Sequence, residues 1–159
     1  MWGRSLLVPK STRSVARFTF LQLCGEPRSA ADYIALCKEF HAFFIDDIPH
    51  MNLDMRDWAR RFITFVDAAY ESKARLFCTS EVEIMKVFSN TTTWDEMSSS
   101  QMRVLMDDLN MDMSDVGNSS IFSGQEELFA FARLLSRLSE MQTKPYADMS
   151  AQLYHLNAS

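Results

Sequence analysis

The most constraining feature of this chain is a pair of short apolar segments with a helical pattern between them. The first, AFFI at residues 42–45, runs directly into Asp46 and Asp47, and the second, ARLFCT, occupies residues 74–79. Between them, apolar side chains recur at steps of three and four residues: Met55, Trp58, Phe62, Phe65, Val66 and Ala69. Strand, helix and strand at this spacing predict a parallel βαβ unit with a right-handed crossover, and therefore an α/β fold.

The residues before this unit predict strands and one further helix. Residues 3–24 are expected to be β-rich, with LLV before Pro9 and VARFTFLQL after it. Ser29 is a good helix N-cap, and Asp32 three residues later completes a near capping box. In the helix that follows, Ile34, Cys37 and Phe40 or His41 have the spacing of a buried face. Asn52 or Asp54 is expected to cap the helix of the βαβ unit, which runs to about Tyr70.

The character of the chain changes after residue 88. Two serine-rich polar stretches predict loops, with a short amphipathic helix between them marked by Met102, Leu105, Met106, Leu109 and Met113. The segment GQEELFAFARLLSRLSEMQ is the strongest helical pattern, with Leu128, Phe131, Leu135 and Leu138 on one face. We therefore divide the chain into 1–88 (β-rich segment plus βαβ unit), 89–124 (polar variable insert), 125–149 (arginine-bearing helix, stopping near Pro145) and 150–159 (frayed tail).

Composition limits the class of protein. With 159 residues, 47% of them hydrophobic, the chain is long enough to bury the core of one domain. Its net charge of −5 argues against a general nucleic-acid binder. Three cysteines without a C-x-x-C pair predict neither a disulfide framework nor a zinc site. The acid-free start has the charge of a mitochondrial transit peptide, but Pro9 and the alternation that follows favour a strand instead.

Asp46 and Asp47 are the first candidate site residues. Ligands of α/β proteins collect at the carboxyl ends of parallel strands, and two acids there resemble a Walker B motif, whose carboxylates organise magnesium and the attacking water. Thr79 and Ser80, at the end of the next strand, have the place of a polar sensor residue. The alternative is structural: Asp47 caps the turn before Pro49, and Asp46 pairs with an arginine. No G-x-x-x-x-G-K-[ST] phosphate loop occurs in the 159 residues.

The arginines supply the other candidates. Arg133 and Arg137 lie four residues apart on a helix, where like charges repel by about 0.2–0.5 kcal/mol and a bound phosphate would attract both. The alternative is a surface ion pair of Arg137 with Glu140. Arg60 and Arg61 are interface or phosphate candidates whose simpler interpretation is contact with Asp57 and solvent. The histidines share no metal-binding spacing, so no metal site is predicted.

Six phrases of the sequence occur in the order typical of one family. They are GRSLLVP, VARFTFLQLC, P-x-SAADYIAL, FFIDDIP, ARRFITFVDAAY and SRLSEMQ. The chain thereby resembles the C-terminal part of the ATPase-family-gene-one-like AAA proteins, also known as lactation elevated protein 1, whose bacterial relative is ZapE. The resemblance covers residues 3 to about 88 and about 125 to 146. It implies a P-loop ATPase fold whose phosphate loop, main Walker B strand and arginine finger lie upstream.

The resemblance also assigns roles. It implies that the start of the chain belongs to the body of the family's domain and argues against a transit peptide there. It makes Asp46 and Asp47 a second Walker-B-like feature. It also makes Arg133 and Arg137 sensor-2-like arginines. It implies ATP and Mg²⁺ for the full-length protein, none for this chain alone, and action on client proteins, as a homo-oligomer, peripheral to the membrane. The expected location is mitochondrial in a eukaryote, for protein quality control, and cytoplasmic in a bacterium. Ala132 and Leu134 depart from the acidic residue and threonine usual beside that arginine.

Two functional hypotheses follow. The first is the C-terminal portion of an ATP-hydrolysing machine, present without its Walker A half. The second is a non-catalytic interaction module that binds the full ATPase or its clients. An independent metal-dependent enzyme centred on Asp46 and Asp47 lacks an identifiable third ligand. A portion cut from a larger core is also expected to leave the FFID strand without neighbours and to be poorly soluble.

Overall fold

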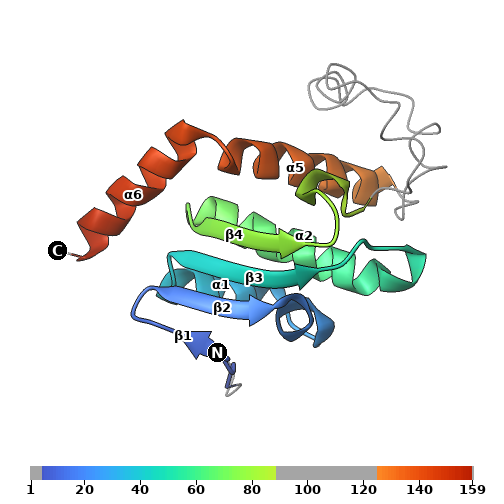
Figure 1. The fold of residues 1–159 in the computed structure, drawn as a ribbon, viewed down its shortest axis with the longest axis horizontal. Coiled ribbons are helices and arrows are strands. Elements are labelled where there is room, and N and C mark those ends of the chain that lie inside the picture. Colours follow the sequence, from blue (N-terminus) through green and yellow to red (C-terminus); the bar gives the residue numbers. More distant parts are fainter. Residues whose placement is uncertain (1–4, 89–124, 159) are drawn as a thin grey trace.

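A computed structural model describes residues 5–88 and 125–158, with one sheet and its helices (Figure 1). The strands are β1 (Lys10–Ser11), β2 (Val15–Thr19), β3 (Ala42–Ile48) and β4 (Arg75–Ser80). The α-helices are α1 (Ala30–Glu39), α2 (Arg56–Glu71), α5 (Gln125–Met141) and α6 (Lys144–Ala158). Short turns of π-helix (Leu21–Gly25) and 3₁₀-helix (Leu53–Met55 and Ile84–Lys86) connect them.

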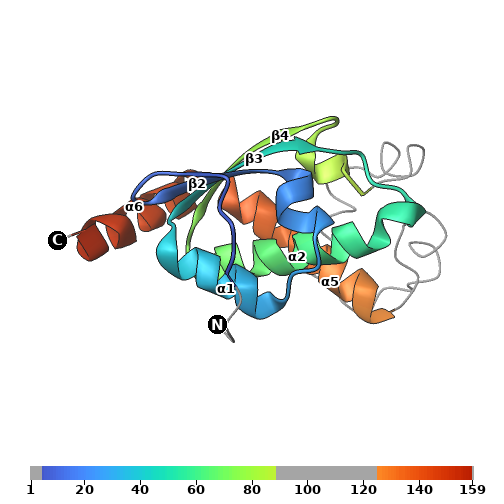
Figure 2. The same cartoon turned by 90° about the horizontal axis from the view of Figure 1, so that it is seen from below.

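The sheet has the order β1-β2-β3-β4, in which β2, β3 and β4 are parallel and β1 is an antiparallel edge. The predicted βαβ unit is therefore confirmed, as is the α/β fold with a β-rich start and a C-terminal helix. Helices α1, α2 and α5 lie on one face of the sheet, and the described chain leaves the other face uncovered (Figure 2). No described helix is long and apolar enough to cross a membrane.

The core fills the space between the sheet and α1 and α2. Phe43 of β3 contacts Phe65 of α2 with ring centroids 5.3 Å apart, and Tyr33 of α1 contacts the same ring at 5.7 Å. Phe62 contacts Phe20 at 5.9 Å. The helical pattern of 55–69 predicted this face correctly, because a 3.6-residue period places Phe62, Phe65, Val66 and Ala69 on one side. All four are buried.

One of the two predicted helix caps is confirmed, and the other caps a 3₁₀ turn in place of the expected helix, since the N-cap of α2 is Met55 without a side-chain hydrogen bond. Ser29 and Asp32 form a reciprocal capping box at the start of α1. Asn52 accepts a hydrogen bond from the Asp54 amide at 3.0 Å and caps the 3₁₀ turn that leads into α2. Polar side chains followed by an apolar helical pattern therefore located the start of α1 and the turn that precedes α2.

Several expectations differ from the structure. The strand expected over 15–23 ends at Thr19, where the chain turns into the π-helix, and β1 lies after Pro9 and not before it. Ile34 is 46% exposed, because Tyr33, Leu36 and Cys37 form the buried face of α1. The segment 42–45 is only half buried, since Phe44 faces the uncovered side at 40% exposure.

The expectation that FFID lacks neighbours was also wrong. β3 is a central strand, paired with β2 and β4 on either side. Residues 150–158 were expected to be frayed and instead belong to α6. The Tyr146 hydroxyl donates to the Ala74 carbonyl at 2.8 Å and Arg75 donates to the Ala147 carbonyl at 3.0 Å, which fastens α6 to the start of β4. The predicted insert helix at 102–113 lies outside the described residues.

On α5, Phe131, Leu134, Leu135 and Leu138 are buried against the sheet domain. Three of these belong to the predicted apolar face, and Leu134 extends it. The side chain of Leu128, the fourth predicted member of that face, lies outside the described ones. Packing of α5 is what brings its arginines against α2.

Candidate functional site

Asp46 and Asp47 lie at the carboxyl end of β3 and have different environments. Asp46 accepts a hydrogen bond from Arg17 Nε on the adjacent strand β2 at 2.6 Å, with 21% of its side chain exposed. This hydrogen bond and the charge of Asp46 raise the pKa of the Arg17 guanidinium. The arginine alternative considered for Asp46 is thus the arrangement observed.

Asp47 interrupts the strand geometry. Its φ of 61° is left-handed, and the pairing of β3 with β4 shifts register between Ile45 and Ile48. The Asp47 amide donates to Thr79 Oγ1 at 3.0 Å, so Thr79 holds the bulge. Nearby, the His50 amide donates to Glu81 Oε2 at 3.0 Å. The bulge turns the Asp47 backbone toward Thr79, whereas Asp46 pairs with Arg17.

This edge does not fit a complete nucleotide or magnesium site. The Asp46 carboxylate is engaged by Arg17, and the described residues contain no group of three or more His, Cys, Asp or Glu side chains placed to hold a metal. The sequence also lacks a phosphate loop. We therefore derive no catalytic step through ATP or Mg²⁺ on these residues.

Arg133 and Arg137 converge on a single carboxylate of α2. Arg137 Nη1 lies 2.5 Å from Asp67 Oδ1, and Arg133 Nη2 lies 2.9 Å from Asp67 Oδ2. Arg137 also donates through Nη2 to Glu71 at 3.0 Å. We call Asp67, Glu71, Arg133 and Arg137 the arginine clamp. It joins α5 to α2 through charge-assisted hydrogen bonds.

Tyr70 extends the clamp along α2. The Arg137 guanidinium lies 4.8 Å from the centre of the Tyr70 ring, a cation–π contact. The Tyr70 hydroxyl donates to Glu140 at 2.6 Å, and this bond raises the pKa of Tyr70. Glu140, which the sequence suggested as a partner of Arg137, is thus hydrogen-bonded to Tyr70 instead.

A cavity of about 680 Å³ lies beside the clamp, between α1, α2 and α5. Lys38, Arg133 and Arg137 contribute positive charge to its lining, and Asp67 and Glu71 contribute negative charge. The two acids already engage one nitrogen of Arg133 and two of Arg137. An incoming anion would therefore have to compete with Asp67.

Arg60 and Arg61 have separate environments. Arg60 lies 4.0 Å from Asp57, in agreement with the simpler interpretation of its charge. Arg61 donates to the Cys24 carbonyl at 3.0 Å, a contact that neither interpretation included. Arg61 therefore connects α2 to the π-helix that follows β2.

The uncovered sheet face carries two stacked aromatic rings. Phe44 of β3 and Phe77 of β4 are directly paired in register, with ring centroids 4.7 Å apart and planes 15° from parallel. They are 40% and 47% exposed. The two rings thus leave aromatic surface partly open to solvent on this face.

Comparison with known proteins places the chain in a family. A family model described as AFG1-like ATPase matches residues 1–110. The chain belongs to the AFG1-like ATPase family. An uncharacterized protein of Schizosaccharomyces pombe is 40% identical over 146 residues, which cover 92% of this chain and 31% of the relative. No solved structure matches.

Two named relatives support the same assignment. Lactation elevated protein 1 homolog B of Danio rerio is 31% identical over 91% of this chain and 28% of the relative. Cell division protein ZapE of Escherichia coli K12 is 32% identical over 80% of this chain and 25% of the relative. The AFG1-like chain thus spans no more than 31% of the length of these relatives. The family resemblance inferred from the six phrases is confirmed.

The partner of the two arginines was missed from the sequence, although a signal was present. Asp67 and Glu71 on α2 are spaced i,i+4, as are Arg133 and Arg137 on α5. Two charged pairs with the same helical spacing and opposite sign are complementary when their helices pack side by side.

Proposed function

We propose that this AFG1-like chain works as the C-terminal portion of an ATP-hydrolysing machine that acts on client proteins, with ATP and Mg²⁺ bound by the remainder of the polypeptide. The observation that carries the proposal is the family match, together with coverage of 31% of the S. pombe relative's length. In a eukaryote the proposed setting is mitochondrial protein quality control at the membrane periphery, and in a bacterium the cytoplasm. The proposed active form is a homo-oligomer.

The proposed contact with the ATP-binding portion is the uncovered sheet face. Phe44 and Phe77 expose aromatic surface there, while the opposite face is already filled by α1, α2 and α5. More than two thirds of the length of the S. pombe relative lies outside the match, which supplies enough chain to cover the face. The pair Arg17–Asp46 borders the aromatic rings and provides polar groups for orientation.

The test uses two polypeptides, the 159-residue chain and the remaining portion of the S. pombe relative, expressed together. Co-purification and ATP hydrolysis that depend on both polypeptides would support the proposal. Exchange of Phe44 and Phe77 for threonine should abolish co-purification. The matched control is Leu153→Thr, which removes an apolar side chain of 39% exposure on α6 and should leave the complex intact. Equal rates of ATP hydrolysis with and without the 159-residue chain would contradict the proposed function.

We propose a phosphate-responsive role for the arginine clamp in that assembly. Arg133 and Arg137 would exchange Asp67 for a nucleotide phosphate, since guanidinium groups bind carboxylate and phosphate oxygens with the same geometry. In the assembled ATPase, Arg137→Gln should lower kcat by more than tenfold while nucleotide affinity changes less than threefold. An unchanged kcat in a folded Arg137→Gln variant would rule out the phosphate-responsive role of the arginine clamp.

The second hypothesis, a non-catalytic interaction module, has one observation in its favour. Within the described residues, β3 has a strand on each side, and the buried side chains form one hydrophobic cluster. Such a module should bind a complete AFG1-like ATPase in trans and change its ATP hydrolysis rate in proportion to occupancy. Folding of the chain with no effect on that rate would favour the first proposal.

A further inference from the structure

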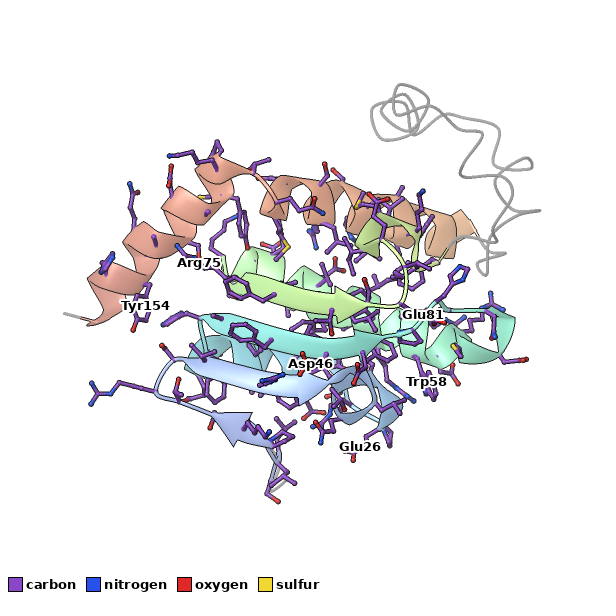
Figure 3. All side chains as sticks on the ribbon, viewed as in Figure 1. Glu26, Asp46, Trp58, Arg75, Glu81 and Tyr154 are labelled. Carbon is purple, nitrogen blue, oxygen red and sulfur yellow. The ribbon has the colours of Figure 1, made fainter. Side chains whose placement is uncertain are left out.

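A second cavity lies at the opposite edge of the sheet from Asp46 and Asp47. It has a volume of about 410 Å³ and lies where β2, β3 and β4 begin, with α6 forming its outer wall. Figure 3 shows Arg75 and Tyr154 close together at this end of the sheet, away from Glu81. Its polar lining consists of Ser14, His41, Arg75, Ser150, Tyr154 and His155.

Arg75 gives the lining of this cavity a positive charge. None of the described residues that line the cavity is acidic. Arg75 is only partly exposed and donates to the Ala147 carbonyl at 3.0 Å, and among described residues it forms no ion pair. The contrast with Arg137 is direct, because Arg137 contacts two carboxylates. A guanidinium that is withdrawn from water without a carboxylate retains its capacity to bind an anion.

Ser150 of α6 adds a hydroxyl to the cavity wall. The residue lines the cavity although it is only 4% exposed, so α6 places it at the inner side of the site and not at the surface. The adjacent hydroxyls of Ser14 and Tyr154 are 3.4 Å apart, a long contact that leaves both available to a ligand.

We propose that this cavity binds a small phosphate-bearing anion. Arg75 supplies the charge, and the hydroxyls of Ser150, Ser14 and Tyr154 donate to phosphate oxygens. The ring of His41 packs edge-on against Tyr154 at 5.5 Å and forms an aromatic wall for an organic group attached to the phosphate. Cavities of roughly 300–1,000 Å³ hold small molecules, so there is room beyond a bare ion.

The site is independent of the proposed ATPase role. It involves none of the arginine clamp or of the uncovered sheet face. Because α6 and the starts of three strands meet there, a bound anion would fasten α6 more firmly to the sheet. The ligand should therefore stabilise the fold as well as bind.

The experiment measures binding to the 159-residue chain by calorimetry at constant ionic strength, with sodium chloride as the balancing salt. The probes are inorganic phosphate and phenyl phosphate. Saturable binding with one site and a rise in melting temperature is expected. Tighter binding of phenyl phosphate would identify a phosphomonoester as the ligand, and equal binding would identify free phosphate. Absence of saturable binding by either probe would overturn the proposal.

Variants assign any binding to this cavity. Ser150→Ala leaves the packing of α6 nearly unchanged and should weaken binding three- to tenfold. Arg75→Gln should weaken it more than tenfold, with the melting temperature of the free variant measured to account for the lost Ala147 contact. The matched control is Lys144→Gln, which removes an 86% exposed charge from the same helix and should leave affinity unchanged. Equal affinity in Ser150→Ala and in the unmodified chain would also overturn the proposal.

Discussion

Arg137 on α5 and Asp67 on α2 lie 2.5 Å apart although 70 residues separate them in the sequence. Their side chains are only 19% and 25% exposed, so water screens this pair less than an ion pair at the surface. Arg133 shares the same carboxylate but is 51% exposed. The clamp therefore has an inner and an outer arginine with unequal expected contributions to stability.

Asp67→Asn should reduce the free energy of unfolding by about 1–3 kcal/mol, because it weakens hydrogen bonds to both arginines. In double-mutant cycles, Asp67 should couple to Arg137 by more than about 1 kcal/mol and to Arg133 by about 0.5 kcal/mol or less. Urea unfolding of the single and double variants measures both coupling energies. Equal coupling to the two arginines would contradict the division into inner and outer.

Two neighbouring phenylalanines should differ greatly on substitution. Phe43 is 0% exposed and packs between Phe40 and Phe65, so Phe43→Ala should destabilise the fold by about 3–5 kcal/mol. Phe44 faces the uncovered side and contacts Phe77, so Phe44→Ala should lose about 1 kcal/mol or less. Thermal melts of the two variants compare them directly. A larger loss for Phe44→Ala would mean that the sheet face is covered.

The left-handed backbone of Asp47 predicts an asymmetric response to substitution. With φ at 61°, Asp47→Gly should be neutral or stabilising by up to about 1 kcal/mol, whereas Asp47→Val should destabilise by about 1–2 kcal/mol. Asp47→Asn retains tolerance of this conformation and serves as the control for loss of charge. Unfolding midpoints measured at one pH give the order of stability of the three variants. A stable Asp47→Val variant would indicate a different bulge geometry.

Alkaline pH should destabilise the fold through its buried thiols. Burial raises the pKa of Cys24 from 9.0 to about 12 and that of Cys37 to about 11. A folded-state pKa above the unfolded value means that this contribution to stability is complete below pH 9 and is lost as pH rises toward 11–12. Urea midpoints between pH 8 and 11 should therefore fall steadily.

The thiol origin of that fall can be separated from other alkaline effects. Desolvation also raises the pKa of Cys78 to about 11, so Cys37→Ala removes one of three contributing thiols; it should make the pH dependence less steep and lower stability at pH 8 through the lost side-chain volume. Cys78 is exposed whereas Cys24 and Cys37 are buried, so a thiol reagent should modify Cys78 first in the folded chain. A midpoint independent of pH up to 11 in the unmodified chain would refute the assignment.

Local patterns were sufficient where a single segment contains the whole signal. The period of α2 predicted the buried faces of Phe62 and Phe65, and Ser29 with Asp32 marked the start of α1. The order of the six phrases gave the family. The site roles of Asp46, Asp47, Arg133 and Arg137 stay predictions, although their positions are now described.

Local patterns failed where a partner distant in sequence decided the outcome. Ile34 has the spacing of a core residue, but α1 packs on the sheet through Tyr33 and Leu36. Residues 150–158 have weak helical periodicity, and α6 forms because Tyr146 and Arg75 provide contacts with the start of β4. A marginal helix gains its stability from such tertiary packing.

The sequence by itself determined the α/β class, the βαβ unit and the AFG1-like family, because periodicity, capping and phrase order are properties of adjacent residues. Only the tertiary structure decided which charges meet. Asp67 lies between two arginines because α5 packs on α2, whereas Arg75, at the start of β4, donates to the Ala147 carbonyl of α6 and contacts no carboxylate among the described residues. The free energy of a charge depends on its neighbours and its exposure to water, and folding sets both.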